Sequence, residues 1–238
     1  MKKGFVIAID GPVASGKGTI AKKLAQKIQA LNINSGGVYR AYAYKLVEQG
    51  ITDLSDKNID EYVKPGEVEI VLSKDFGSFD ITLNGKSVIQ KIQLPKISMA
   101  ASNFGKNREF VSFISTELRR IVKGYEHTGK DIIMEGRQIG TDVFPDADVK
   151  IFLTADLETR ASRRFEQYQQ NGIEKTYEEV KQETQQRDEQ DLNREFGALP
   201  KNPQERGYEI IDNTGLNEDQ TLEQIVQILE DKKIWQMK

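Results

Sequence analysis

Residues 11–19 carry the clearest chemical signature in the chain, Gly-Pro-Val-Ala-Ser-Gly-Lys-Gly-Thr. An apolar run at residues 5–9 precedes this segment, and an amphipathic helix pattern at residues 20–28 follows it. In such a strand, turn and helix unit, backbone N–H groups surround a polyphosphate and Lys17 can reach its outer phosphates. The hydroxyl of Thr19 comes one position later than in the general pattern, a spacing that small-molecule and nucleotide kinases often have. We therefore expect a nucleoside triphosphate site.

The residues expected to bind the triphosphate are Gly11, Ser15, Gly16, Lys17, Gly18 and Thr19. We expect Lys17 to face solvent when no nucleotide is bound. The alternative is an ordinary glycine-rich turn with a solvated lysine. The strand before it and the helix after it favour the phosphate loop.

Composition limits the partners of this chain. Its 238 residues include 34 basic and 37 acidic side chains, a net charge of −3, so no overall field favours nucleic acid or an anionic membrane. Bound phosphates must then be held by local arginine clusters. Cysteine is absent, the N-terminal apolar stretch is too short for a signal peptide, and no apolar run approaches the roughly 20 residues that span a bilayer. We expect a cytoplasmic monomer that binds neither nucleic acid nor membrane.

The hydrophobic pattern alternates strands with helices, which predicts a parallel sheet with right-handed crossovers. One region differs, because it alternates with period two and contains Asn84-Gly85, a strong hairpin signal. Three short antiparallel strands are predicted there, at residues 67–73, 79–83 and 86–90. A single helix is predicted at residues 98–125. The arginine-rich helices of residues 156–194 favour a mobile flap that closes over phosphates, since phosphoryl transfer depends on charge clamps.

Several further blocks are more specific than the phosphate loop. They include Gly-Arg-x-Ile-Gly-Thr followed by Phe-Pro-Asp-Ala, and Asp-x-Asn-Arg near the end of the flap. Together with the phosphate loop and the three-stranded insert, the matching blocks are residues 9–12, 35–41, 135–141, 143–147, 150–155, 187–188 and 191–194. With these blocks the chain resembles the bacterial cytidylate kinases, members of the nucleoside monophosphate kinase group, over nearly its whole length.

The resemblance implies an α/β P-loop kinase that transfers the γ-phosphoryl group of ATP, with Mg²⁺, to CMP or dCMP. Its implied fold is a parallel sheet flanked by helices, with a small antiparallel three-stranded insert and a short helical lid. The implied core comprises residues 1–34, 126–155 and 195–238. Residues 35–125 would bind the monophosphate, with the insert at about residues 67–90, and residues 156–194 would form the lid with its flanking helices.

The resemblance also implies roles for single residues. Lys17 and Thr19 belong with the ATP phosphates and Mg²⁺, and Glu135 would orient Mg²⁺-bound water unless it is a plain loop carboxylate. The implied catalytic cations are Lys17, Arg137, Arg160, Arg164 and Arg187. The implied acceptor-binding residues are Ser35, Tyr39, Arg40, Ser102, Arg108, Arg137, Gln138, Asp191 and Arg194. No side-chain base is required, because a phosphate oxygen is already a nucleophile near neutral pH.

Two departures bear on the acceptor. The family usually has Asp where this chain has Gln138, and the base-reading arginine of the family aligns with Ser112, one helical turn from Arg108. We expect activity on CMP and dCMP with weaker discrimination against UMP. The rival within kinases is a different nucleotide or a small phosphorylated metabolite. A GTPase is disfavoured because no Asn-Lys-x-Asp segment occurs in a suitable place, and a non-enzymatic nucleotide-binding module would not need the lid arginines.

Overall fold

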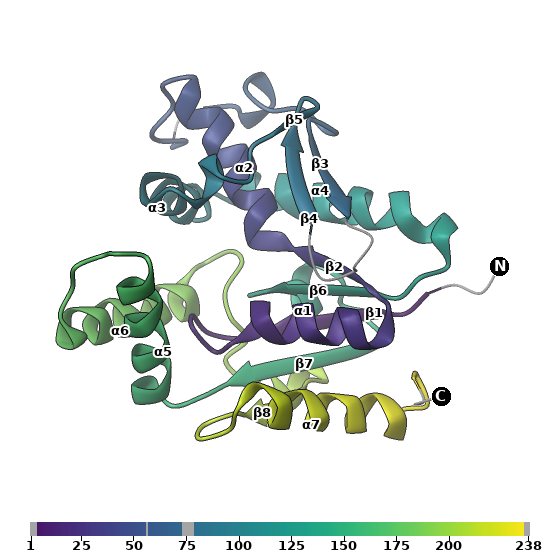
Figure 1. The fold of residues 1–238 in the computed structure, drawn as a ribbon. Coiled ribbons are helices and arrows are strands. Elements are labelled where there is room, and N and C mark those ends of the chain that lie inside the picture. The colour runs from purple at the N-terminus through teal and green to yellow at the C-terminus, as the bar shows by residue number, and fades with distance from the viewer. Residues whose placement is uncertain (1–3, 56, 73–78, 236–238) are drawn as a thin grey trace.

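The computed structural model describes residues 4–55, 57–72 and 79–235. Its centre is a five-stranded, all-parallel sheet in the order β2-β6-β1-β7-β8 (Figure 1). The strands are β1 Val6–Asp10, β2 Leu31–Asn34, β6 Ile132–Gly136, β7 Val149–Thr154 and β8 Glu209–Asp212. This architecture confirms the predicted α/β class, with helices covering the sheet.

Both faces of the sheet are buried because alternate side chains of each strand point to opposite sides. In β1, Ile7 and Ile9 enter one apolar cluster, whereas Ala8 enters the other. The first cluster packs under α1 (Lys17–Ile28) and α7 (Glu218–Asp231), which contact each other. These two helices run side by side across the front of the sheet in Figure 1.

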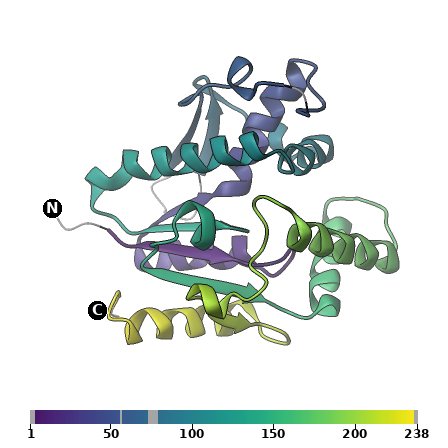
Figure 2. The same ribbon diagram turned by 180° about the vertical axis from the view of Figure 1, so that it is seen from behind.

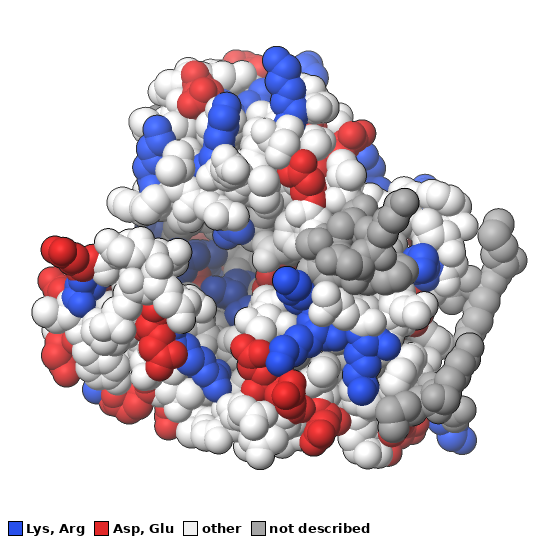
Figure 3. Space-filling model, in the orientation of Figure 1, with Lys and Arg blue, Asp and Glu red and all other residues white. Residues whose placement is uncertain are grey.

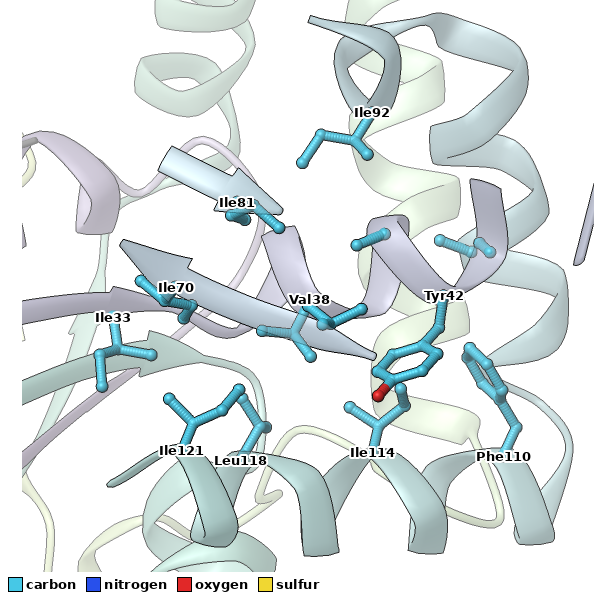
Figure 4. Packing of buried hydrophobic residues seen from close by; sticks show 14 of the residues in the cluster. Ile33, Val38, Tyr42, Ile70, Ile81, Ile92, Phe110, Ile114, Leu118 and Ile121 are labelled. Atoms are coloured by element: carbon cyan, nitrogen blue, oxygen red, sulfur yellow. The ribbon is translucent and has the colours of Figure 1, made fainter. Parts of the chain in front are cut away.

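The second cluster lies beneath α2 (Ser35–Glu48) and α4 (Arg108–Tyr125). The antiparallel insert packs onto the same cluster through Ile70 and Ile81, which lie beside Val38 of α2 (Figure 4). Its strands are β3 Val68–Leu72, β4 Phe79–Leu83 and β5 Lys86–Ser87. The insert is therefore a separate sheet that packs against α2 and also contacts β2 of the central sheet.

The predicted hairpin turn is confirmed, since Asn84 and Gly85 both have positive φ, 50° and 75°, as a type I′ turn requires. The third strand is shorter than predicted. It ends at Ser87 because a 3₁₀ turn at Lys91–Gln93 follows closely. The end of the first predicted strand, residue 73, lies outside the described residues.

The single helix predicted at residues 98–125 is wrong, because the structure has two. Helix α3 (Pro95–Phe104) begins at a proline in its first turn, and α4 begins after Asn107, whose Oδ1 accepts a hydrogen bond from the Phe110 N–H at 2.9 Å. The capping asparagine starts a new helix axis after Gly105. The apolar spacing continues across the break, which is why periodicity alone did not reveal it.

The arginine-rich segment forms two helices, α5 (Leu157–Gln170) and α6 (Tyr177–Asn193), which contact each other and cross in both ribbon views (Figures 1 and 2). Asp156 caps α5, and Thr176 with Glu179 forms a capping box on α6. Further 3₁₀ turns are Ile59–Glu61, Glu126–Thr128 and Gln204–Arg206, and Ile139–Val143 forms a π-helical turn. No helix within the described residues is long and apolar enough to cross a bilayer.

Candidate active site

The carboxyl ends of the parallel strands open into one large cavity of about 660 Å³. Such an edge is where open α/β sheets bind ligands. The cavity lies between the phosphate loop, helices α2 and α3, and the helices α5 and α6, and Figure 3 shows Lys and Arg side chains inside the hollow. The predicted site residues that line it are Gly16, Lys17, Gly18, Thr19, Ser35, Tyr39, Arg40, Ser102, Glu135, Arg137, Gln138, Arg164, Arg187 and Arg194.

The phosphate loop connects β1 to α1, as its sequence predicts. Gly11, with φ 151°, passes so close to β7 that a Cβ would lie 2.0 Å from the Leu153 carbonyl oxygen. Gly16 is left-handed, with φ 89°, and directly precedes the first turn of α1. The N-terminus of α1 therefore points its free backbone N–H groups toward the cavity.

Lys17 is buried, and the expectation that it faces solvent is wrong. Only 5% of its surface is exposed, and its Nζ donates to the Pro12 carbonyl at 2.6 Å and to Ser15 Oγ at 3.3 Å. Burial, helped by the charge of Arg137, lowers the pKa of Lys17 to about 7. The Pro12 carbonyl and Ser15 Oγ accept hydrogen bonds from the ammonium group in place of water, so Lys17 can stay buried.

This low pKa predicts a pH dependence for the binding of a nucleoside triphosphate. Phosphates stabilise the ammonium form, so above the pKa of about 7 a proton must be taken up as the nucleotide binds. Affinity is expected to fall by up to about tenfold per pH unit between roughly pH 7.5 and 9, where the nucleotide phosphates are already ionised. Calorimetry in buffers of different ionisation enthalpy measures the uptake. A flat affinity profile with no proton uptake would contradict it.

Asp191 holds together a cluster of arginines at the cavity. Its side chain is fully buried, and three guanidinium groups converge on it: Arg137 Nε at 2.8 Å, Arg187 Nε at 3.2 Å and Arg194 Nη2 at 2.8 Å. Burial alone would raise the pKa of Asp191, but the three arginines lower it overall. One carboxylate thus fixes three cations that line the cavity, while leaving an excess of positive charge for an anionic ligand.

Some polar atoms of the site have no hydrogen-bond partner among the described residues. They are buried, and they include Nε of Arg40, Nε of Arg194 and Oε1 of Gln138. Buried polar atoms are normally satisfied, so unfilled donors on two arginines indicate a site built for an anion. Burial also lowers the pKa of Arg40, as expected for a cation held away from water.

Gln138 is wedged between two elements. Its Nε2 donates to the Tyr39 hydroxyl at 3.1 Å, and its Oε1 faces Gly197, where a Cβ would lie only 2.2 Å away. The positive φ of Gly197, 68°, together with this close approach, explains the glycine in the segment after α6. Gln138 therefore connects α2 to the segment that follows α6.

Thr19 and Glu135 suit a magnesium site. Both line the cavity, and Glu135 Oε1 lies 3.8 Å from the place where a Cβ of Gly18 would be. No cluster of three or more acidic, His or Cys side chains that could hold a metal occurs in the described part of the chain. Mg²⁺ typically keeps several waters and binds substrate phosphates with one or two protein groups, so a hydroxyl and a carboxylate beside the phosphate loop fit it.

Other predicted residues lie outside the cavity lining. Ser15 is fully buried within the loop, and Gly11 and Asp191 lie beneath the surface of the site. Arg108 is exposed and lies over the Phe196 ring, 5.4 Å from its centroid. Ser112 is exposed on α4. The structure therefore does not bring the proposed base-reading position, at 112 or at 108, to the site.

Arg160 also lies outside the cavity lining, although its sequence position suggests a free lid cation. It is buried and pairs with Asp188 of α6, Nη1 to Oδ2 at 2.6 Å. Its Nε donates to the Ala155 carbonyl at 2.9 Å, and its Nη1 donates to the Val13 carbonyl in the phosphate loop at 3.2 Å. In this arrangement Arg160 connects helices α5 and α6 to the phosphate loop.

Two residues that help to position the site were not predicted from the sequence. Asp10 is completely buried at the end of β1 and accepts from the Ile139 N–H at 2.9 Å and the Gly140 N–H at 2.8 Å. It thus fixes the turn that follows Gln138. Asn34 caps α2 through the Gly37 N–H at 2.6 Å and donates to Glu135. A polar residue at the last position of an apolar strand was the available signal for both.

Comparisons with known proteins agree with this geometry. The Cytidylate kinase family model matches residues 7–231. Cytidylate kinase of Thermotoga maritima is 39% identical over 230 residues, covering 96% of this chain and 98% of that protein, and that of Caldicellulosiruptor bescii is 37% identical with 96% of each covered. A solved structure of an uncharacterized protein from Eubacterium ventriosum has a similar fold, with a TM-score of 0.53 at 14% identity, covering 96% of this chain and 99% of that one. A match this long, with relatives this similar along almost their whole length, shows that the chain belongs to the cytidylate kinase family.

Proposed function

We propose that this protein transfers the γ-phosphoryl group of ATP to CMP or dCMP, giving ADP and CDP or dCDP. The observation that carries the proposal is that the phosphate loop and the arginines held by Asp191 line one cavity. One wall suits a triphosphate and the opposite wall suits a phosphate-bearing acceptor. Family membership supports the same donor and acceptor, and it does not favour a different nucleotide or a small metabolite.

The chemistry needs charge and position more than a base. An oxygen of the acceptor phosphate attacks the γ-phosphorus, the bond from that phosphorus to the bridging oxygen breaks, and ADP leaves with that oxygen. Both reacting groups are anions, so fixed cations must lie around them. Lys17 approaches from the donor side and Arg137, Arg187 and Arg194 from the acceptor side.

Mg²⁺ is the expected companion of ATP. Thr19 and Glu135 are the residues that would hold it, directly or through water, at the mouth of the phosphate loop. When bound, the ion would neutralise charge on the donor phosphates. Asn34 keeps the Glu135 carboxylate in place by donating to it.

We expect this protein to discriminate less strongly between cytosine and uracil than a protein with a carboxylate at position 138 would. The amide of Gln138 can accept from the amino group of cytosine or, turned over, donate to the carbonyl of uracil. We expect the unchanged protein to turn over CMP and dCMP, with measurable turnover of UMP. The variant Gln138→Asp is expected to raise the ratio of kcat/KM for CMP to that for UMP by roughly 10- to 100-fold, the value of one charged hydrogen bond.

Ser112→Arg is the control for this prediction, because Ser112 is exposed and lies outside the cavity lining. That variant should leave the ratio unchanged, so the double variant with Gln138→Asp should behave like Gln138→Asp alone. Strong exclusion of UMP by the unchanged protein would contradict the role of Gln138. A specificity shift caused by Ser112→Arg would instead restore position 112 as a base reader.

We also propose a separate role for each of three parts of the chain. Residues 1–34, 126–155 and 195–238 form the core, residues 35–125 bind the acceptor, and residues 156–194 act as the lid. Arg164 and Arg187 reach the cavity from the two lid helices, so bound phosphates would draw these helices inward. Hydrogen exchange across residues 156–175 should slow when a bisubstrate analogue binds. Unchanged exchange over residues 156–194 would argue against a lid.

A panel of acceptors tests the function as a whole. The protein is mixed with Mg²⁺ and ATP and with CMP, dCMP, UMP, AMP or small alcohols in turn, and ADP release is followed. Release is expected to be fastest with CMP and dCMP. Activity confined to a non-pyrimidine acceptor would contradict the proposal. The cytoplasmic location and the monomeric state also stay predictions, and light scattering tests the second.

A further inference from the structure

We propose that Asn213 is a positioning residue that holds the peptide between Ser15 and Gly16 in the orientation needed to bind phosphate. The inference rests on the proposed function, because it concerns how the ATP site is kept ready. Asn213 lies just after β8, 198 residues away from Ser15 in sequence. Only 2% of its surface is exposed.

The carboxamide of Asn213 joins two elements. Its Nδ2 donates to the Ser15 carbonyl oxygen at 3.0 Å, and its Oδ1 accepts from Arg163 Nη1 of helix α5 at 3.0 Å. Arg163 can only donate, so the amide oxygen must face it and the NH₂ group must face the loop. Arg163 Nη2 also donates to the backbone carbonyl of Asn213 at 3.2 Å, which fixes the residue further.

This contact controls the direction of a backbone N–H. In a trans peptide the carbonyl and the following N–H point to opposite sides, and the structure has no cis peptide in its described parts. Because Asn213 holds the Ser15 carbonyl outward, the Gly16 N–H points the other way, toward the side of the loop that lines the cavity. Gly16 is left-handed, with φ 89°, and glycine has little intrinsic barrier to a different backbone orientation. A hydrogen bond from another segment, such as that of Asn213, is therefore needed to fix the orientation of this peptide.

A second peptide of the loop, between Val13 and Ala14, is held in a similar way. The Val13 carbonyl accepts from Arg160 Nη1 at 3.2 Å, and Arg160 also belongs to α5. Helix α5 thus reaches two carbonyls of the loop, one directly through Arg160 and one through Arg163 and Asn213. These contacts link helix α5 to the phosphate loop. Of the three linking residues, Arg160, Arg163 and Asn213, only Asn213 has a short, neutral side chain that can be replaced by an isosteric variant.

The competing interpretation is that Asn213 only stabilises the turn after β8. Thr214 provides the matched control, because it lies in the same turn and its Oγ1 accepts from the Asp156 N–H at 2.8 Å, at the start of α5. Thr214 has no hydrogen bond to the phosphate loop among the described contacts. Thr214→Ala therefore removes a contact between this turn and α5 without removing the contact between Asn213 and the phosphate loop.

The test measures binding of ATP with Mg²⁺, and separately of CMP, by calorimetry for the unchanged protein, Asn213→Ala and Thr214→Ala. Asn213→Ala is expected to weaken ATP binding about 5- to 10-fold, the value of one buried hydrogen bond, and to change CMP binding less than about twofold. Thr214→Ala should change neither. Equal loss for ATP and CMP in Asn213→Ala, or ATP affinity equal to that of Thr214→Ala, would overturn the proposal.

Asn213→Asp keeps the test decisive if the alanine variant folds poorly. It preserves the shape and strengthens the contact with Arg163, while an oxygen replaces the donor to Ser15. We expect a folded variant, checked by its melting temperature, with weaker ATP binding. The loss relative to the unchanged protein should persist at high salt, where long-range repulsion is screened. Undiminished ATP binding by this variant would overturn the inference. An unchanged protein that binds no ATP would contradict the proposed function itself.

Discussion

Replacing Lys17 with alanine is expected to lower kcat by about 10²- to 10³-fold while leaving a folded protein, because the loop loses the cation that meets charge developing on the donor phosphates. The structure explains why folding should survive. Burial lowers the pKa of Lys17 to about 7, so the folded state binds this proton less well than the unfolded state. The side chain thus disfavours folding at neutral pH. This penalty shrinks as pH rises from about 7 toward 10.5, the ordinary pKa of a lysine.

Lys22→Ala is the matched control for this variant. Lys22 lies in the same helix, α1, but is exposed and does not line the cavity. Its removal should leave turnover unchanged, with steady-state kinetics and a thermal melt measured on both variants. Near-normal turnover by Lys17→Ala would remove the phosphate loop from the mechanism.

Asp191→Asn is expected to have the largest effect on stability, lowering the free energy of unfolding by roughly 3–5 kcal/mol, as removal of one partner from a buried ion pair does. The reason is specific to this site. Three guanidinium groups lie against the carboxylate, and an amide of the same shape would leave them without a counter-charge. Urea unfolding measures the loss, and KM for CMP should rise because Arg137 and Arg194 would no longer be fixed.

The pH dependence provides an internal check. The pKa of Asp191 is lowered in the folded protein, so its contribution to stability is fully present above 3.8, the ordinary pKa of an aspartate. That contribution is lost as pH falls through the lower pKa of the folded state. The difference in stability between the unchanged protein and Asp191→Asn should therefore shrink in strong acid. Glu189→Gln, which changes an exposed carboxylate of the same helix, should cost little at any pH. A constant difference, or an equal cost for Glu189→Gln, would contradict the argument.

Local patterns were sufficient for the fold class. The apolar runs and the glycine-rich turn predicted the parallel sheet and the loop before α1, and Asn84-Gly85 predicted the hairpin. These features depend on residues that are close in sequence, where spacing and turn chemistry act directly. The break between α3 and α4 was missed because the apolar repeat continues across it, although Asn107 is a typical cap.

The site could be predicted less completely, because its details depend on contacts between distant segments. The burial of Lys17 follows from acceptors that the folded loop presents to it. Arg160 and Arg164 are four residues apart on one helix, yet one contacts Asp188 and the loop whereas the other lines the cavity. Spacing indicated that these arginines cluster. It could not indicate which of them face the ligand and which hold the loop from outside.

The most direct test of the proposed function is the stoichiometry of one reaction. The protein is incubated with Mg²⁺, ATP and CMP, and the nucleotides are separated by chromatography over time. Equal amounts of CDP and ADP should form, and both should form about 10²- to 10³-fold more slowly when Lys17→Ala replaces the unchanged protein. ADP without CDP would show hydrolysis in place of transfer, and ATP that stays intact in the presence of CMP would contradict the account altogether.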